Sequence, residues 1–326
     1  EEEEEGGDVP DNAPEDCPGT TSAMAGKSST CAGCPNQAAC ASGQSSAPDP
    51  AIEEINARMS LVKHKILVLS GKGGVGKSTV ASQVAMALSG GGNVTGLLDI
   101  DVCGPSAPRM LGVEDMDVHQ SGSGWQPVWV DENLCVMSIG FMLPSRDDAV
   151  VWRGVRKIGL IKQFLKDVNW EKLDYLVIDA PPGTSDEHIT IAQCLNQTSN
   201  VGAIIVTTPQ EVALLDVRKE INFCRKAGIK ILGVVENMAG FVCPHCGNSS
   251  EIFVPSEADS VKGKDTTIRG AEAMANKHGI PFLGRIPLDP KLGIASERGE
   301  ALKQSMALTS LQSVVHNLRN NCREQH

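Results

Sequence analysis

Short apolar runs alternate with amphipathic segments along the chain from residue 65 onward. Each run of Val, Ile and Leu has the length of one buried strand, and the segments between them have the spacing of helices. The predicted strands are Ile66–Leu69, Val94–Leu98, Tyr175–Ile178, Ala203–Val206 and Ile231–Val235. The predicted helices include Lys77–Leu88, Val155–Lys166, Glu187–Leu195, Val212–Arg225 and Leu302–Leu318. Because unbroken apolar strands that alternate with helices are typical of a parallel sheet buried on both sides, the pattern predicts a doubly wound α/β domain with a mostly parallel sheet and helices on both faces.

The N-terminal part of the chain lacks this periodicity and is rich in Glu, Gly, Pro, Ser and Ala. A segment of this composition buries too little apolar surface to offset the entropy of ordering, so it is predicted to be a flexible tail. The acidic run Glu1–Glu5 fits a solvated stretch without a specific ligand. The sequence therefore divides into a tail, residues 1–60, which carries four cysteines, and a folded domain, residues 61–326.

A glycine-rich loop follows the first predicted strand and opens the first predicted helix. It reads Ser70-Gly71-Lys72-Gly73-Gly74-Val75-Gly76-Lys77-Ser78-Thr79 and contains the G-x-x-x-x-G-K-[ST] spacing of a P-loop. Glycines let successive backbone N–H groups surround an anion, and the helix N-terminus adds a partial positive charge. In such a loop Lys77 reaches the β- and γ-phosphates and the Ser78 hydroxyl binds Mg²⁺. The loop therefore predicts a binding site for ATP and Mg²⁺ at residues 71–79.

Carboxylates follow two of the predicted strands. Asp99 and Asp101 come at the end of the second strand, and Asp179 ends the apolar run that begins at Tyr175. An Asp in this position can also cap the next helix. Two such strand ends after a phosphate loop favour contact with a nucleotide and Mg²⁺, because ligands of α/β sheets bind at the carboxyl ends of the strands.

The basic P-loop pattern does not require Lys72. With this lysine the loop resembles the deviant Walker A motif of the MinD/Mrp-type ATPases, and the resemblance covers about residues 60–320. It implies a P-loop NTPase fold and a dimer in which Lys72 reaches the nucleotide of the partner protomer. It also implies that Asp99 and Asp101 form switch I, with Asp101 placing the attacking water, and that Asn237 contacts adenine. Asp179 and Gly183 would form switch II, so that the implied catalytic residues are Lys72, Lys77, Asp101 and Asp179.

The four cysteines of the tail lie within a short stretch, at Cys17, Cys31, Cys34 and Cys40. Four thiolates suffice for a [4Fe–4S] cluster or for a tetrahedral zinc site. Structural zinc sites usually contain two C-x₂-C pairs or added histidines, whereas this stretch has one such pair and no histidine. The spacing therefore favours a cluster and leaves zinc as the alternative.

A second cysteine pair occurs in Cys243-Pro244-His245-Cys246-Gly247. Two cysteines are half of a four-ligand site, and a two-fold dimer would bring two such pairs together on its axis. A [4Fe–4S] cluster bridging two protomers is the prediction. Half of a zinc site is the alternative, and a thiol–disulfide motif is disfavoured because the residues after Cys246 do not begin a helix.

Composition and charge narrow the range of molecules that the chain is expected to bind. The chain has 29 Lys and Arg against 40 Asp and Glu, a net charge of −11, which argues against nucleic acid and anionic membranes as partners. Eleven cysteines are an odd number and do not indicate a disulfide framework. The N-terminal residues resemble neither a signal peptide nor a basic transit peptide, so a reducing, cytoplasmic location is expected.

With the P-loop and both cysteine groups, the chain resembles the cytosolic iron–sulfur cluster assembly factors of the Mrp/nucleotide-binding-protein family, in the form with an N-terminal four-cysteine extension. The resemblance implies an ATP-dependent scaffold that assembles [4Fe–4S] clusters and transfers them to cytosolic and nuclear apo-proteins. It also implies a homodimer, or a heteromer with a paralogous P-loop ATPase, that works with downstream assembly factors. The alternatives are an ATP-gated reductase of the nitrogenase-iron-protein type and a MinD-like positioning ATPase with structural zinc.

Overall fold

The computed structural model of the chain describes residues 14, 17, 24–41, 50–102, 104–143, 154–243, 246, 248–262 and 267–323. The chain divides into two units, Glu1–Ile52 and Glu53–His326, and each is described here by itself. The predicted acidic run, Glu1–Glu5, lies outside the described residues.

The first unit contains short turns around its cysteines. A 3₁₀ turn, η1, covers Ser29–Cys31, and a five-residue helix, α1, covers Gln37–Ala41. The backbone N–H of Cys34 donates to the carbonyl of Cys31 at 3.1 Å, so one turn holds both cysteines of the C-x₂-C pair. Local hydrogen bonds therefore build regular turns in a segment whose composition predicts none, without burying much apolar surface.

The boundary between the units lies earlier than the residue 60 that composition predicts. Helix α2, Pro50–Met59, runs across it. Its residues Ile55 and Met59 are fully buried in the core of the second unit, which is why the second unit begins at Glu53.

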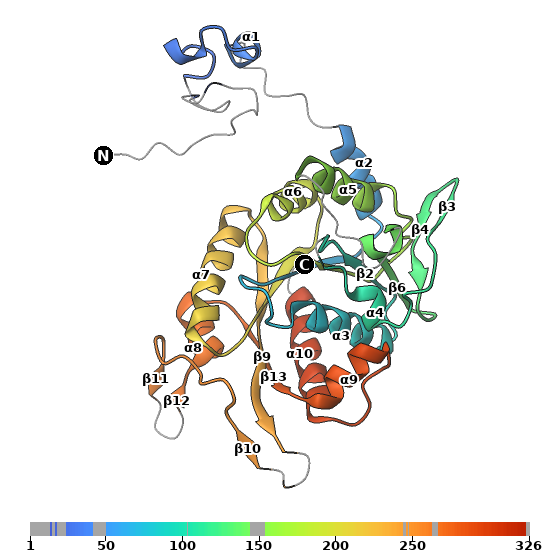
Figure 1. The fold of residues 1–326 in the computed structure, drawn as a ribbon, viewed down its shortest axis with the longest axis vertical. Coiled ribbons are helices and arrows are strands. Elements are labelled where there is room, and N and C mark those ends of the chain that lie inside the picture. The colour runs from blue at the N-terminus through green and yellow to red at the C-terminus, as the bar shows by residue number, and fades with distance from the viewer. Residues whose placement is uncertain are drawn as a thin grey trace. The chain divides into compact units, whose positions relative to one another are not determined.

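Among the described residues, nine strands of the second unit form one sheet in the order β10-β9-β8-β1-β7-β2-β6-β5, with β13 paired to β9 (Figure 1). All pairings are parallel except those of the short strands β5 and β10. The strands are β1 His64–Leu69, β2 Thr95–Asp99, β5 Val128–Trp129, β6 Leu134–Ser138, β7 Tyr175–Asp179, β8 Val201–Thr207, β9 Lys230–Val242, β10 Ser249–Ser250 and β13 Phe282–Leu288. Two small hairpins lie outside this sheet, β3 His119–Ser121 with β4 Gly124–Gln126, and β11 Val261–Lys262 with β12 Thr267–Ile268.

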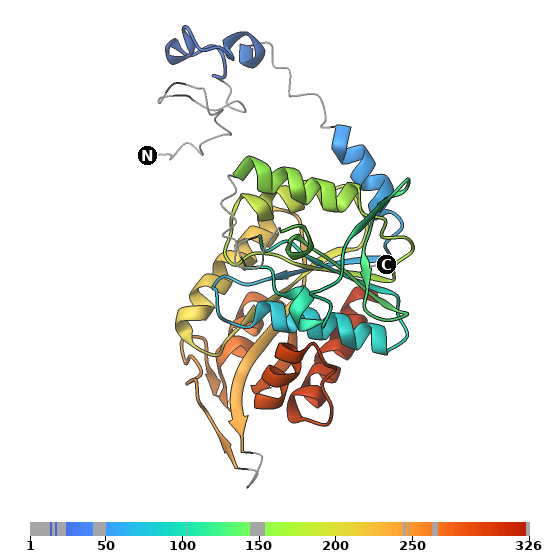
Figure 2. The ribbon, with the colours of Figure 1, turned by 45° about the vertical axis from the view of Figure 1, so that its right-hand side comes forward.

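Helices cover both faces of the sheet (Figure 2). In β1, Ile66 and Val68 face a core shared with α3, α4, α9 and α10, whereas Leu67 and Leu69 face a core shared with α2, α5 and α6. Helices α7 and α8 pack on β8 and β9. The bounds are α3 Lys77–Gly90, α4 Ala107–Met110, α5 Gly154–Lys166, α6 Asp186–Leu195, α7 Glu211–Lys226, α8 Gly270–His278, α9 Pro290–Arg298 and α10 Met306–Arg323, with a 3₁₀ turn, η2, at Ile139–Met142.

The doubly wound fold is thus confirmed, and each predicted strand and helix is present within a few residues of its expected bounds, except that β9 continues to Val242 instead of ending at Val235. The last helix begins at Met306 instead of Leu302, because the Ser305 hydroxyl accepts the Leu308 N–H at 3.1 Å and so starts the helix there. Strands β6 and β13 are additional to the prediction. Among the described residues, no helix is both long and apolar enough to cross a membrane.

Lys65 joins α2 to the sheet from inside the core. Its side chain is buried in β1, and Nζ donates to the carbonyls of Val62 at 3.0 Å and Met59 at 3.4 Å, where α2 ends. Burial lowers the pKa of Lys65 from 10.5 to about 8. The folded protein therefore releases this proton at a lower pH than the unfolded chain does.

We predict that Lys65 makes the fold more stable as the pH rises above about 8, because the unfolded chain alone still binds the proton there. The free energy of unfolding of the wild type, relative to Lys65→Met, should rise with pH by up to about 1.4 kcal/mol per unit. Denaturant unfolding of both proteins at several pH values measures this difference. A difference that does not change between about pH 7.5 and about pH 9.5 would contradict the prediction.

Candidate functional site

The glycine-rich loop connects β1 to α3, as its sequence predicts. Gly74 and Gly76 have φ of 79° and 80°, a left-handed conformation that strains any residue with a Cβ atom. Gly76 is the N-cap of α3, so the backbone N–H groups at the start of this helix are directed into the loop. A helix N-terminus behind a glycine-rich turn is suited to bind phosphate.

Two other elements hold the loop from outside. Gly71 packs directly on α7, where a Cβ atom at residue 71 would lie 2.5 Å from Cβ of Asp216. On β9, Asn237 is buried, and its Nδ2 donates to the carbonyl of Val75 at 2.9 Å. The amide group of Asn237 thus supports the backbone of the loop, and the adenine contact that the resemblance implies stays a prediction.

Lys77 lies at the centre of a buried charge cluster. Its Nζ is 2.6 Å from Oδ1 of Asp179, 3.9 Å from Oδ2 of Asp101 and 3.3 Å from Oγ of Ser78. The parallel registers explain this meeting, because Asp179 on β7 is aligned with Val68 on β1 and with Asp99 on β2. The structure therefore brings Lys77 together with Asp101 and Asp179, the two carboxylates of the predicted catalytic set.

Asp99 serves the loop that carries Asp101. It is fully buried, and its carboxylate accepts the N–H groups of Asp101, Ser106 and Ala107 at 3.0 to 3.1 Å. The hydroxyl of Ser138 donates to the same carboxylate at 3.2 Å. These bonds give Asp99 a capping role in the loop that leads to α4, and its contact with the nucleotide stays a prediction.

The buried carboxylates also raise one another's proton affinity. Burial, and next the charge of Asp179, raises the pKa of Asp99. Burial raises the pKa of Asp179 as well, although Lys77 and Ser78 oppose the shift. The Ser78 hydroxyl and the Asp179 carboxylate supply oxygen atoms of the kind that Mg²⁺ prefers, and a divalent cation here would compensate the excess negative charge.

The loop after Asp179, residues 180–185, contacts the phosphate loop. The N–H of Gly183 donates to the carbonyl of Ser70 at 2.8 Å, and a Cβ atom at residue 73 would lie 3.9 Å from the ring of Pro182. At the far end of this loop, the Ser185 N–H donates to Nδ1 of His188 at 3.1 Å. The contact of His188 with this loop was not predicted from the sequence. The signal that could have found it is a Ser at a helix N-cap followed three residues later by an acceptor side chain.

Lys72 behaves differently from Lys77. Its side chain is exposed, and it makes no hydrogen bond or ion pair with any residue that the structure describes. Its ammonium group is therefore available to a group outside the described chain, in contrast to the engaged ammonium of Lys77.

The second cysteine pair lies at the tip of the hairpin formed by β9 and β10. The N–H of Cys243 donates to the carbonyl of Asn248 at 2.9 Å and closes the hairpin; Cys243 is half-buried and Cys246 is exposed. Pro244, His245 and Gly247 lie outside the described residues. Figure 1 shows β9 extending beyond the rest of the sheet to reach this tip.

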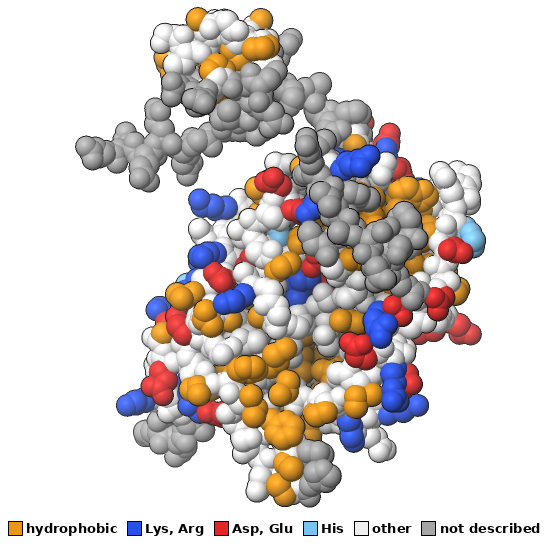
Figure 3. Space-filling view, viewed as in Figure 1, with side chains coloured by type: hydrophobic (Ala, Val, Ile, Leu, Met, Phe, Trp, Pro, Cys, Tyr) orange, Lys and Arg blue, Asp and Glu red, His pale blue; other side chains and the backbone are white. Residues whose placement is uncertain are grey.

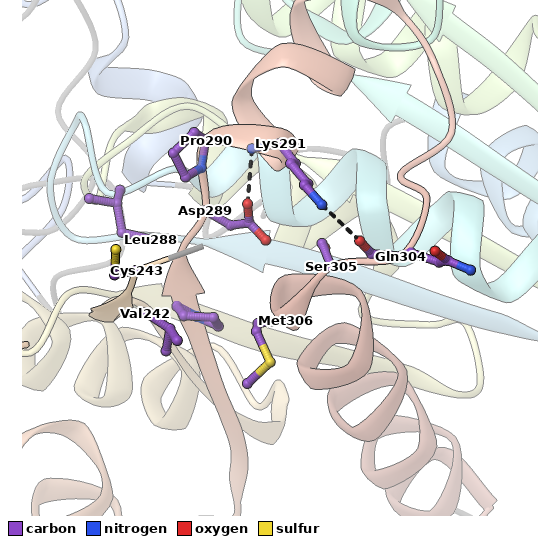
Figure 4. A pocket seen from close by; sticks show the side chains of 10 residues that line it. Val242, Cys243, Leu288, Asp289, Pro290, Lys291, Gln304, Ser305 and Met306 are labelled. Carbon is purple, nitrogen blue, oxygen red and sulfur yellow. Dashed lines mark hydrogen bonds between the residues drawn. The ribbon is translucent and has the colours of Figure 1, made fainter. Parts of the chain in front are cut away.

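An apolar pocket of about 420 Å³ adjoins Cys243. Figure 4 shows Cys243, Val242 and Leu288 on one side of it and Lys291, Gln304 and Ser305 on the other. In Figure 3 hydrophobic side chains gather on the same lower part of the molecule, over the ends of β9 and β13. The cysteine pair thus stands beside an apolar surface.

The described residues contain no group of three or more His, Cys, Asp or Glu side chains at metal-binding distances. Within the first unit, Cys31 is buried, and the other three predicted ligands, Cys17, Cys34 and Cys40, are half-buried.

Comparisons with known proteins agree with this geometry. The family model described as ParA: NUBPL iron-transfer P-loop NTPase matches residues 61–322. A solved nucleotide-binding protein from Archaeoglobus fulgidus, in complex with ADP, is 36% identical with a TM-score of 0.66, over 79% of this chain and 95% of that chain. The cell division ATPase MinD of Pyrococcus furiosus is 21% identical with a TM-score of 0.53, over 79% and 99%. The septum site-determining protein MinD of Pyrococcus horikoshii, complexed with Mg-ADP, is 21% identical with a TM-score of 0.54, over 81% and 98%. These two MinD structures share the fold.

We predict that Gly71→Ala destabilises the protein by about 1–3 kcal/mol, because the new methyl group collides with Asp216 of α7. Gly73→Ala is the matched control in the same loop, since its methyl group would meet only the Pro182 ring, at 3.9 Å. Thermal unfolding without nucleotide measures both effects. Equal melting temperatures of the two variants would contradict the close packing of α7 on the loop.

Proposed function

This chain belongs to the NUBPL iron-transfer P-loop NTPase family, and we propose that it is an ATP-dependent scaffold that assembles [4Fe–4S] clusters and transfers them to apo-proteins. One observation carries the proposal: a single strand, β9, touches the phosphate loop and ends at the cysteine pair. A change at the nucleotide therefore has a direct path to the ligands of the cargo.

Strand β9 has two differently supported parts. Up to Glu236 it lies between β8 and β13 within the sheet. Beyond Asn237 it leaves β8, and Met238 and Gly240 have φ of 55° and 80°. Six residue steps separate Asn237 from Cys243, and they span less than the roughly 20 Å of a fully extended strand because of these two turns. A shift of Val75 in the phosphate loop would be passed to Asn237 by their hydrogen bond and from there along the strand.

The chemistry at the loop is hydrolysis of ATP to ADP and phosphate. Lys77 would bind the β- and γ-phosphates, Ser78 and Asp179 would hold Mg²⁺, and Asp101 would orient the attacking water. Lys72, exposed and unengaged in the described chain, would reach the nucleotide of a second protomer. The protein would thus act as a homodimer or with a paralogous P-loop ATPase.

The cargo would be a [4Fe–4S] cluster shared by two Cys243/Cys246 pairs. Each chain contributes two thiolates, and two chains supply the four that a cluster requires. ATP binding or hydrolysis would change the spacing of the pairs and release the cluster to cytosolic and nuclear apo-proteins, with downstream assembly factors as further partners. The apolar pocket beside Cys243 supports a site at which a second protein approaches.

A second cluster would reside in the tail. The donor set of Cys17, Cys31, Cys34 and Cys40 fits a [4Fe–4S] cluster because it consists of thiols alone, and one backbone turn already holds Cys31 and Cys34 together. When bound, such a cluster supplies electron-transfer chemistry. The protein would carry out this function in the cytoplasm.

We predict that Lys72→Ala retains ATP binding but hydrolyses ATP at least about tenfold more slowly, because its ammonium group stabilises charge only in the transition state. Lys77→Ala is the contrasting variant. It should lose nucleotide binding and some stability, since it leaves Asp179 buried without its partner. A fluorescent ATP analogue measures binding, and phosphate release measures turnover. Wild-type turnover in Lys72→Ala would refute its role.

We predict that anaerobically reconstituted protein holds about six iron atoms per chain, four in the tail and two as half of a shared cluster. The double variant Cys243→Ser/Cys246→Ser should hold about four and transfer no cluster from this site. Cys224→Ala is the matched control, because burial raises the pKa of this thiol to about 12 and keeps it out of metal binding.

Iron, acid-labile sulfide and zinc analysis decides between the two metals. About one zinc per chain with little sulfide would refute the scaffold and leave an ATPase with structural zinc. A double variant that still passes its cluster to an apo-protein would equally refute transfer through Cys243 and Cys246.

A further inference from the structure

His188 is buried at the start of α6, beside the loop of residues 180–185, which we name the switch loop. Only 2% of the side chain is exposed. Its Nδ1 accepts the backbone N–H of Ser185 at 3.1 Å and lies 3.1 Å from the Ser185 hydroxyl. Across the ring, Phe223 of α7 packs edge-on with the ring centroids 6.0 Å apart. The imidazole is therefore fixed in place by two helices and one end of the switch loop.

We propose that His188 is a positioning residue for ATP hydrolysis, which holds the switch loop against the phosphate loop while its imidazole is neutral and releases it when the ring is protonated. The inference rests on the proposed ATPase activity and is independent of cluster binding.

The hydrogen bonds define the protonation state that holds the loop. Because Nδ1 accepts from the Ser185 N–H, Nδ1 carries no proton and the proton of the neutral ring is on Nε2. Protonation would place a second N–H at Nδ1, opposite the Ser185 N–H, and two donors cannot pair. The charged ring thus loses its bond from the Ser185 N–H, which is one of the two bonds of the capping box that joins Ser185 to His188.

The other ring nitrogen of His188, Nε2, lies in a different hydrogen-bonding environment from Nδ1. Nε2 is buried and has no partner at full hydrogen-bond geometry among the described residues, while the backbone carbonyl of Pro181 is close enough to favour a charge on the ring. A buried donor without a partner costs free energy, so an arrangement of the loop that supplies a partner is favoured. A small closure of the switch loop would let Nε2–H donate to Pro181, so that the ring would hold both ends of the loop.

The switch loop passes this constraint to the reacting groups. It begins directly after Asp179, which pairs with Lys77 at 2.6 Å. In its middle, Gly183 donates to Ser70 at the base of the phosphate loop. If the Ser185 end is released, the contacts that align the switch loop with the phosphates loosen, and turnover falls more than nucleotide binding.

The charges around the ring set the direction of the pH effect. Burial lowers the pKa of His188 below 6.5, and Lys77 opposes the ring charge further. Glu187 and Asp101 favour the ring charge, but Glu187 is paired with Lys157 of α5 at 3.1 Å. The element packed on the other side, α7, faces the ring with the uncharged Phe223. The neutral ring therefore persists at neutral pH, and hydrolysis should fall as the medium becomes acidic.

Two substitutions of His188 separate its hydrogen bond with Ser185 from the protonation of its ring. Gln is a normal capping-box residue at this position and accepts the Ser185 N–H without titrating, so His188→Gln should keep kcat within about threefold of the wild type at pH 7.5 and lose the acidic decline. His188→Ala removes the hydrogen bond with Ser185, and kcat should fall about tenfold at every pH with KM nearly unchanged. His119→Gln, at an exposed histidine of β3, is the matched control and should keep the wild-type profile.

The test is the pH profile of kcat and KM for the wild type and the three variants, with melting temperatures and binding of a fluorescent ADP analogue as folding checks. An acidic decline that persists unchanged in His188→Gln overturns the inference, and so does wild-type kcat in His188→Ala. If His188→Ala does not fold, the ¹⁵N chemical shift of Nδ1 decides in the wild type, since it must report an unprotonated Nδ1 at neutral pH. A wild type that hydrolyses no ATP at any pH would instead refute the ATPase activity itself.

Discussion

The pairing of one buried lysine with buried carboxylates is the constraint on which the nucleotide site depends. Lys77 is the cation nearest to Asp179 and Asp101, and Asp99 adds a third acid at the same edge of the sheet. Separating Lys77 from Asp179 without replacement would leave a charge in the interior at a cost of about 3–5 kcal/mol. A nucleotide phosphate competes for Lys77, so it must arrive with a cation that takes over the charge of Asp179. The requirement for Mg²⁺ with the nucleotide thus follows from the charge balance of the site.

The sequence was sufficient to predict the parts of the fold and site that depend on local pattern. Apolar runs predicted the central strands, and the spacing of Gly71, Gly76 and Lys77 located the phosphate loop. The different surroundings of Asp99 and Asp101 could not be predicted, because both follow the same strand and only the path of the loop to Ala107 directs Asp99 inward. The same applies to Asn237, whose partner Val75 is far away in sequence. The early start of the second unit was missed because only two residues of α2, Ile55 and Met59, reach the core.

The cysteine pair shows a similar limit. The spacing of Cys243 and Cys246 gives the number of thiols, but only strand pairing reveals that they stand at the tip of a hairpin. A strand that extends beyond its sheet presents its end to other molecules while its base stays anchored in the core. This arrangement suits ligands that must face a second protomer and then a recipient. Among the described residues, an apolar pocket lies beside Cys243 at this end of the strand.

Besides the ion pairs of Lys77, contacts with three different elements join the phosphate loop to the rest of the second unit. Asp216 packs α7 on Gly71, Asn237 ties β9 to Val75, and Gly183 ties the switch loop to Ser70. Since the loop is confined on these sides, a phosphate that repositions it must strain at least one contact. Interfaces of this kind switch between discrete arrangements instead of deforming smoothly. The contact through β9 leads to Cys243, and that through the switch loop leads to His188. A displacement of the loop can therefore reach both distant residues, which is what the proposed use of hydrolysis to time the release of a cluster requires.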